Sequence, residues 1–233
     1  MPSHGFSSWK RIEALGWGIP CALGCNLLIA AVYDRDYWND EYIDEVRTKL
    51  QRSTAFVHFH RRKEIENYLL VPSVFARALV QAVSERQSRG ELEGSPLPTE
   101  QDVRTLLEEI TDTEKAAVQA QYIARRQEFF RISHSKLDLA TIAQEALRVI
   151  DSKWRTLDTR IEIICGKTVL AALRQRVQTL FSVNVGDNRI ISCFHKDEVP
   201  RDLKELMEGL ERFRNMGSAP AMPLAAAPDN ASV

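Results

Sequence analysis

Residues 27–36 read Leu-Leu-Ile-Ala-Ala-Val-Tyr-Asp-Arg-Asp, a continuous apolar run that ends in two aspartates. An apolar run without polar alternation is typical of a strand buried on both faces of a parallel sheet. Ligands of open α/β sheets bind at the carboxyl ends of the strands, where Asp34 and Asp36 fall. If the chain stays extended there, both aspartates point to one side and Arg35 points to the other. Because adjacent carboxylates repel each other unless a cation lies between them, the pair predicts a divalent metal site. The alternative is that the aspartates simply begin a turn.

The composition bounds the class of protein. The chain of 233 residues can form one large domain or two small ones, and with 44% hydrophobic and 27% charged residues it can build a core. Its formal net charge of −1 excludes a globally basic nucleic-acid coat protein. It does not exclude a nuclease, whose acidic metal centre offsets basic residues elsewhere.

Cysteine spacing and hydropathy indicate where we expect the protein to reside. The four cysteines, Cys21, Cys25, Cys165 and Cys193, form no compact metal-binding pattern, so we interpret them as free thiols of a reducing cytosol. No charged segment followed by an apolar core begins the sequence, so we expect no signal peptide. The longest apolar stretch is too short to cross a bilayer. We therefore expect a soluble, cytoplasmic protein with no membrane partner.

Regular patterns flank the opening run on both sides. A short helix and a loop are expected before the strand over residues 27–33. After the aspartates, Ile43, Val46 and Leu50 have helical spacing, and the β-branched and aromatic residues 54–60 indicate a second strand. A strand, a helix and a strand within about 35 residues form a βαβ unit, whose two strands should be parallel.

Residues 72–157 carry a helical pattern, which is interrupted over residues 90–98 by Gly, Ser and Pro. The apolar stretch 161–165 is expected to return to the sheet. Helices are expected over residues 139–157, with Asp138 as the N-cap, and then over 168–181 and 200–214. These patterns predict four regions: the first part of a sheet domain (1–71), a helical insertion (72–157), the second part of the sheet domain (158–214) and a disordered tail (215–233).

A second group of charged residues follows the second expected strand. Because the carboxyl ends of parallel strands meet at one edge of a sheet, Glu64 and Glu66 should lie near Asp34 and Asp36 and hold hard cations with them. The neighbouring Arg61, Arg62 and Lys63 are candidate contacts to nucleic-acid phosphates. The alternative is an ordinary helix start, because Glu is favoured in the first turn of a helix.

Four motifs together resemble the Toprim portion of the OLD (overcoming lysogenisation defect) family of ATP-dependent endonucleases, over roughly residues 9–214. The motifs are Asp34-Arg35-Asp36-Tyr37, Arg61-Arg62-Lys63-Glu64-Ile65-Glu66-Asn67-Tyr68-Leu69, Gly166-Lys167 and Asp197-Glu198-Val199-Pro200. The resemblance implies a sheet of Toprim type and a metal-dependent nuclease that cuts DNA and is joined to an ABC-type ATPase.

The resemblance also implies roles for individual residues. Asp34 and Asp36 match the Asp-x-Asp metal ligands, and Glu66 (less closely Glu64) matches the acidic position after the next strand. Lys167 matches a lysine that contacts the transition state or a phosphate. The implied mechanism is two-metal hydrolysis, in which one cation activates water and the other stabilises the departing oxygen, while Lys167 offsets charge on the phosphate.

The chain departs from the family in two respects. No apolar strand closed by Glu precedes Leu27, although Toprim modules begin with such a strand. The ATPase is also missing: Gly166-Lys167-Thr168 imitates the end of a Walker A loop, but Ile161 stands where the motif requires its first glycine. We therefore expect no nucleotide site here, and interpret the chain as the C-terminal portion of a longer or split nuclease that is weakly active alone.

The sequence thus predicts a helix-rich α/β fold, with a small parallel sheet of Toprim type and a large helical insertion. The expected function is metal-dependent DNA endonuclease, with Mg²⁺ or Mn²⁺ as the cofactor and ATP acting only through a separate ATPase domain or subunit. DNA and that ATPase are the expected partners, and a homo-oligomer is compatible with the sequence. The alternatives are a non-catalytic interaction or regulatory module of Toprim-like fold, and another Toprim phosphotransfer chemistry such as that of primases or topoisomerases.

Overall fold

The centre of the fold is a sheet of two parallel strands, β1 (Ala30–Tyr33) and β2 (Phe56–Phe59), joined by α2 (Asp40–Leu50). The structure is a computed structural model and describes residues 8–24, 27–91, 96–133 and 137–217. The register pairs Ala30 with Phe56 and Tyr33 with Phe59. The predicted βαβ unit is therefore confirmed, although both strands are shorter than the expected 27–33 and 54–60.

The sequence explains why α2 forms and which face it buries. The Asn39 side chain accepts a hydrogen bond from the backbone N–H of Tyr42 at 3.3 Å, which caps the first turn. Ile43, Val46 and Leu50 are buried against the sheet, as their spacing predicted.

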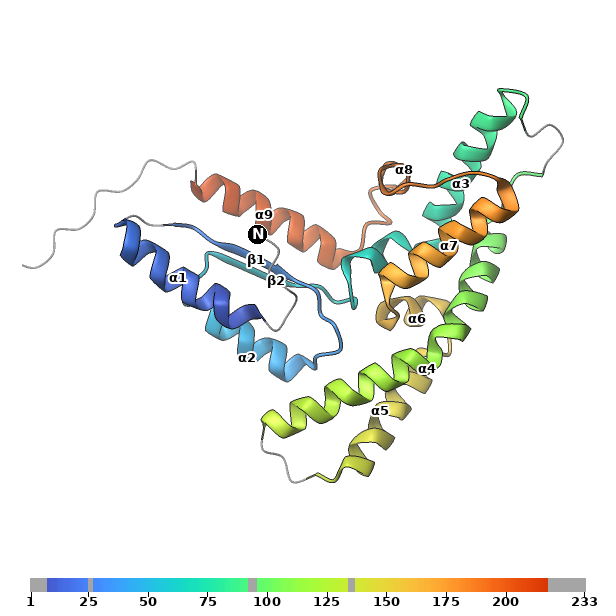
Figure 1. The fold of residues 1–233 in the computed structure, drawn as a ribbon. Coiled ribbons are helices and arrows are strands. Elements are labelled where there is room, and N and C mark those ends of the chain that lie inside the picture. The colour runs from blue at the N-terminus through green and yellow to red at the C-terminus, as the bar shows by residue number, and fades with distance from the viewer. Residues whose placement is uncertain (1–7, 25–26, 92–95, 134–136, 218–233) are drawn as a thin grey trace, which may run out of the picture.

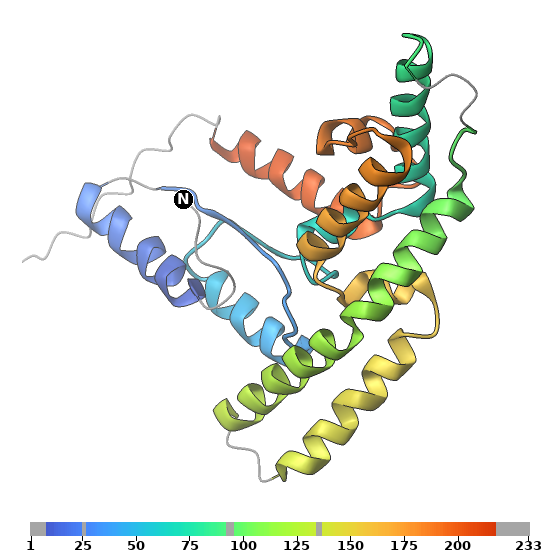
Figure 2. The ribbon, with the colours of Figure 1, turned by 45° about the vertical axis from the view of Figure 1, so that its right-hand side comes forward.

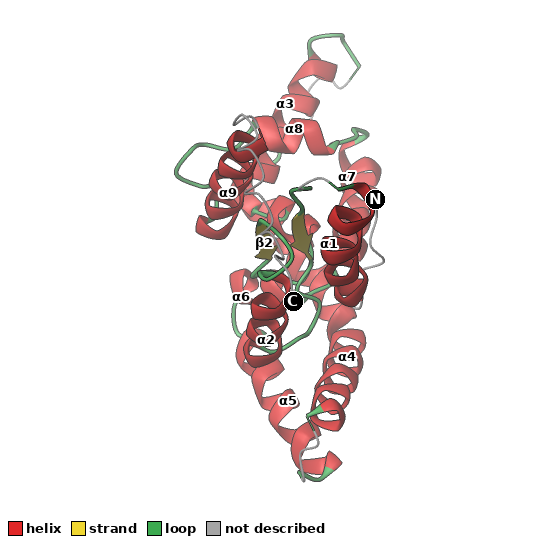
Figure 3. Cartoon of the chain, turned by 90° about the vertical axis from the view of Figure 1, so that its left-hand side faces the viewer, coloured by secondary structure: helices red, strands yellow, loops and turns green. Residues whose placement is uncertain are grey.

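Helices cover both faces of the sheet (Figures 1 and 3). On one face, Tyr33 and Phe59 stack with ring centroids 5.2 Å apart and pack in a core with α2 and with Trp9 of α1 (Trp9–Leu23). On the other face lies α9 (Arg201–Gly217), whose Gly209 meets the ring of Phe56 so closely that a Cβ would overlap it.

The remaining elements are helical and form a second, larger core (Figure 2). They are the 3₁₀ helix η2 (Ile65–Leu69) and the helices α3 (Pro72–Gln87), α4 (Glu100–Ile132), α5 (Leu139–Lys153), α6 (Leu157–Ile163), α7 (Gly166–Phe181) and α8 (Asp187–Ser192). The long α4 packs antiparallel to α5 (Figures 1 and 2), and its C-terminal part reaches the smaller core, where Phe129 packs against Tyr42 of α2. The side chain of Asp138 caps α5, as expected.

The structure corrects two sequence expectations in this region. The single helix expected over 139–157 is divided, because α5 ends at Lys153 and Thr156 caps a new helix by accepting the N–H of Thr159. The apolar stretch 161–165 does not return to the sheet, since Ile161 lies in α6. Leu157, Ile161 and Ile164 are buried at helical spacing, and this period decides their structure.

Other boundaries agree more closely. The helices expected over 168–181 and 200–214 correspond to α7 and α9. A disordered tail was expected from residue 215, but α9 continues to Gly217; the rest of the expected tail, residues 218–233, lies outside the described part of the chain. None of the helices in the described ranges is both long enough and apolar enough to cross a membrane.

Candidate functional site

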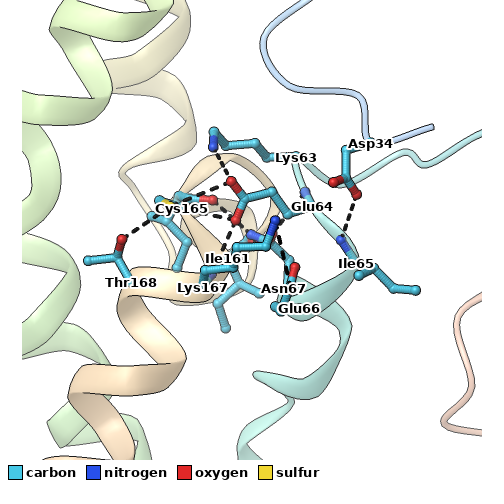
Figure 4. Close-up of polar contacts among 11 residues, drawn as sticks. Asp34, Lys63, Glu64, Ile65, Glu66, Asn67, Ile161, Cys165, Lys167 and Thr168 are labelled. Atoms are coloured by element: carbon cyan, nitrogen blue, oxygen red, sulfur yellow. Dashed lines mark hydrogen bonds and ion pairs between the residues drawn. The ribbon is translucent and has the colours of Figure 1, made fainter. Parts of the chain in front are cut away.

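The segments that follow β1 and β2 run side by side, as the parallel topology predicted. The N–H of Asp36 donates to the backbone oxygen of Lys63 at 3.0 Å. The N–H of Ile65 donates to Oδ1 of Asp34, also at 3.0 Å. Figure 4 shows the Asp34 carboxylate directed at the backbone N–H of Ile65, the first residue of η2. The structure thus brings Asp34 and the second acidic group to the same edge of the sheet.

Asp34 and Asp36 do not share one side of an extended strand, so that expectation is wrong. Strand β1 ends at Tyr33, and Asp36 has a φ of 49°, in the left-handed region that Asp tolerates better than most residues. The turn buries Tyr37 and Trp38. Asp36 consequently lines a cleft beside β2, whereas Asp34 faces Ile65.

The partly buried position of Asp36 changes the pKa of its carboxyl group. Burial raises the pKa of its carboxyl group above the ordinary value. The charges of Lys63 and Arg125 oppose the rise, and those of Asp34 and Glu64 add to it. The charge of Asp34 thus contributes to the raised pKa of Asp36, although the two carboxylates lie in different surroundings.

Glu64 is buried, with 7% of its surface exposed, and is surrounded by donors. Its Oε1 accepts from Nζ of Lys63 at 2.5 Å, and its Oε2 accepts from the backbone N–H of Lys167 at 3.1 Å. Burial raises the pKa of Glu64, but these hydrogen bonds and the charges of both lysines outweigh it and lower the pKa overall. Glu64 therefore stays ionised at the N-terminus of α7, where a carboxylate complements the helix dipole.

Glu66 and Lys167 face each other across the junction of η2 and α7. Nζ of Lys167 lies 3.9 Å from Oε1 of Glu66. Oε2 of Glu66 is buried and has no hydrogen-bond partner. Partial burial lowers the pKa of Lys167, but the carboxylates of Glu66, Glu64 and Asp34 outweigh it and raise the pKa. The expectation that Lys167 reaches the acidic group agrees with this geometry, although a helix N-terminus delivers it and not a strand.

The three basic residues before Glu64 are placed differently from one another. Lys63 is buried, pairs with Glu64 and lies 5.1 Å from the centre of the Tyr37 ring. Arg62 donates to the backbone oxygen of Asn67 at 2.7 Å, and burial lowers its pKa. Only the Arg61 side chain among the three is largely exposed, at 64%. Of the proposed phosphate contacts, Arg61 is therefore the most exposed, Arg62 is half-buried at the cleft, and Lys63 is buried.

An open cleft of about 910 Å³ lies beside β2, between the sheet and the helices α4, α5 and α6. His58 and His60 line it, with ring centroids 5.2 Å apart. Nε2 of His58 and Nδ1 of His60 are buried without a hydrogen-bond partner. Burial lowers the pKa of His58 to about 4 and also lowers that of His60, so both rings are neutral at pH 7.

Two residues that sequence reasoning did not single out support the site. Asn67 is fully buried and donates from Nδ2 to the backbone oxygens of Ile161, at 2.6 Å, and Ile164, at 2.9 Å. Asp202 of α9 accepts from the Tyr68 hydroxyl and from the N–H of Arg61. Asn67 stands three residues after Glu64, a capping-box spacing that could have indicated its role. No local pattern marked Asp202.

The carboxylates of the site bear on whether it can hold the predicted cation. Within the described ranges, no three His, Cys, Asp or Glu side chains are already arranged to hold a metal ion. The unpartnered Oε2 of Glu66 nevertheless suits a hard cation, which prefers oxygen ligands, and Asp34 follows the neighbouring strand at the same edge of the sheet. Comparison of the chain with protein-family models, with curated proteins and with solved structures gives no match.

Proposed function

We propose that the chain is the Toprim-like catalytic portion of a metal-dependent DNA endonuclease of the OLD type. The proposal assigns the metal to Asp34 and Glu66, with the charge of Asp36 nearby, and the phosphate to Lys167. One observation carries it: Oε2 of Glu66 is buried without a partner in a group of carboxylates that also contains a lysine.

That observation favours a cation for an energetic reason. A buried carboxylate oxygen without a partner loses its hydration and gains nothing in return, a cost of about 1–3 kcal/mol or more for a charged group. Lys167 does not remove the cost, because its Nζ lies 3.9 Å from the other oxygen, Oε1, and 60% of its side chain is exposed. A divalent cation on Oε2 would satisfy the oxygen and reduce the repulsion between Glu66 and Asp34.

The residues can then be assigned to steps of phosphodiester hydrolysis. A Mg²⁺ or Mn²⁺ ion held by Asp34 and Glu66 would supply an activated water and polarise the phosphate. Lys167 stays protonated, because the carboxylates around it raise its pKa, so it can stabilise negative charge on the phosphate oxygens. Arg61, exposed at the end of β2, can contact the neighbouring backbone phosphates. In this proposal ATP acts only through a separate ATPase domain or subunit.

Manganese binding measured by electron paramagnetic resonance tests the metal assignment directly. We expect one class of Mn²⁺ site, weakened at least about tenfold by Asp34→Asn and by Glu66→Gln, because each removes an anionic ligand. Glu109→Gln is the matched control, since Glu109 is an exposed carboxylate on α4 and should not affect binding. Equal binding by wild type and Glu66→Gln would contradict the assignment.

Lys167→Met separates metal binding from chemistry. It should leave Mn²⁺ affinity within about threefold, because Lys167 is not a ligand, but lower plasmid nicking by about 10²-fold. Nicking that is unaffected by both Lys167→Met and Glu66→Gln would contradict the proposed site, and wild type without any metal-dependent nicking would favour a non-catalytic module with the same fold.

A further inference from the structure

Lys63 and Glu64 form a buried ion pair next to the candidate site (Figure 4), and the proposed function gives neither side chain a role. The side chains of Lys63 and Glu64 are only 6% and 9% exposed. Besides Lys63, the N–H of Lys167 donates to Glu64, and Sγ of Cys165 lies 3.5 Å from each carboxylate oxygen. Donors of the protein itself thus occupy both oxygens of Glu64, unlike Oε2 of Glu66.

Asn67 reinforces the same junction. Its Oδ1 accepts the N–H of Glu64 at 3.0 Å, while its Nδ2 binds the two carbonyls at the end of α6. Gly166, the first residue of α7, approaches Asn67 so closely that a Cβ would overlap its Oδ1. Glu64 and Asn67 therefore fix the position of the N-terminus of α7 relative to η2.

The position of α7 relative to η2 determines whether the side chains of Glu66 and Lys167 face each other. Glu66 lies in the first turn of η2 and Lys167 in the first turn of α7, and about 100 residues separate them along the chain. Glu66 stands two residues after Glu64 in the chain, and the backbone N–H of Lys167 donates to Glu64, so the Glu64 contacts set where both side chains lie. If α7 moved away from η2, Lys167 would no longer face Glu66.

We propose that Glu64 is a positioning residue and not a metal ligand: its carboxylate holds the N-terminus of α7 against η2, so that Lys167 faces Glu66 and the metal ligands. The inference rests on the proposed function for the identity of the site, but the clamp itself can be tested without a metal. It also replaces the expectation that Glu64 and Glu66 ligate a cation together.

Rescue by a neutral pair distinguishes positioning from ligation. Glu64→Gln leaves the Lys63 charge buried without a counter-charge, and should weaken Mn²⁺ binding about tenfold, as loss of an orienting partner typically does. The double variant Lys63→Met/Glu64→Gln removes both charges and keeps an oxygen for the N–H of Lys167. It should restore Mn²⁺ affinity to within about threefold of wild type.

The matched comparison is Glu66→Gln, whose loss should not be restored by adding Lys63→Met, because a missing ligand cannot be replaced by neutralising a neighbour. If Lys63→Met/Glu64→Gln binds Mn²⁺ as weakly as Glu64→Gln, Glu64 is a ligand and the inference is overturned.

Nuclear magnetic resonance tests the clamp in the wild-type chain, whether or not the metal assignment holds. The backbone amide of Lys167 donates to Glu64, so in wild type it should be strongly protected from hydrogen exchange, and Glu64→Ala should remove this protection. The same amide should be protected from hydrogen exchange in wild type and in the double variant. A Lys167 amide that exchanges as fast in wild type as in Glu64→Ala overturns the clamp, whereas wild type with a protected amide but without Mn²⁺ binding overturns only the proposed function.

Discussion

At the scale of single residues, Asn67 shows how much one buried amide can organise. It is fully buried, and its side chain accepts from Glu64 and donates to Ile161 and Ile164. Asn67→Ala leaves one N–H and two carbonyls without these partners. We expect the free energy of unfolding to fall by about 2–4 kcal/mol, measured by urea denaturation.

The control for that measurement is Asn188→Ala. Asn188 is an exposed residue of α8, and its replacement should change stability by less than about 0.5 kcal/mol. If the two variants were equally stable, the hydrogen bonds of Asn67 would not stabilise the native state.

His58 predicts a pH dependence of stability with a definite sign. Burial, and then the nearby His60, lowers its folded pKa from 6.5 to about 4, while the charges of Asp202 and Glu205 oppose the shift. Between these pH values the unfolded state binds more protons, so stability is present above pH 6.5 and is lost as the pH falls toward 4. Because His58 retains some contact with solvent, we expect about 1 kcal/mol from this residue.

Thermal unfolding from pH 7 to pH 4 measures this effect. His58→Gln should flatten the curve over this range, and His195→Gln, at an exposed histidine, should not. A wild-type curve that rises as the pH falls from 6.5 would contradict the assigned sign.

At the scale of secondary-structure elements, α9 packs closely on the sheet where its Gly209 meets the ring of Phe56. Gly→Ala inside a helix usually stabilises by about 0.5–1 kcal/mol. A Cβ at Gly209 would overlap the Phe56 ring, so Gly209→Ala should instead destabilise the chain in thermal melts.

The control is Gly18→Ala in α1, where nothing lies within 4 Å of the added Cβ and the usual gain should be seen. Adding Phe56→Leu should recover part of the loss in Gly209→Ala. Equal gains at Gly18 and Gly209 would mean that α9 does not rest on Phe56.

The elements also show what the sequence could predict. The run ending at Tyr33 and the residues 54–60 predicted two parallel strands, because buried strands leave a strong local pattern. The path after Tyr33 was not predictable, because the left-handed φ of Asp36 depends on burying Tyr37 and Trp38. Residues 161–165 were misassigned, since a short apolar stretch suits a buried helix as well as a strand.

The candidate site was predictable to a similar degree. The βαβ topology and the family resemblance predicted that Asp34, Glu66 and Lys167 lie near one another. In the structure, Asp34 contacts Ile65 of η2, and Lys167 of α7 faces Glu66 of η2. The separate roles of Glu64 and Glu66 could not be read from the chain. They depend on which side chain turns toward α7, an element that begins about 100 residues later.

At the scale of the whole molecule, the described chain has two hydrophobic cores. The smaller core joins the sheet to α1 and α2, and the larger one joins the helices α3 to α8. The two cores meet at a boundary, where Tyr37 follows β1 but packs edge-on against Tyr122 of α4, with ring centroids 5.6 Å apart, and Phe129 of α4 packs against the smaller core. The candidate site lies at this boundary, because Asp34 follows a strand of the smaller core and Lys167 begins a helix of the larger one.

This division predicts unequal local stability. The smaller core contains fewer buried apolar residues, so β1, β2 and α2 should open at a lower free energy than α3 and α7, and their amides should exchange sooner in hydrogen-exchange mass spectrometry.

A ligand that binds only when the two cores are in contact stabilises that contact by mass action. Because Asp34 and Glu66 would hold the cation from opposite sides of the boundary, Mn²⁺ should slow exchange in β1 and η2 in wild type but not in Glu66→Gln. Exchange that is uniform along the chain would contradict the two cores, and slowing by Mn²⁺ that persists in Glu66→Gln would place the ion away from the boundary.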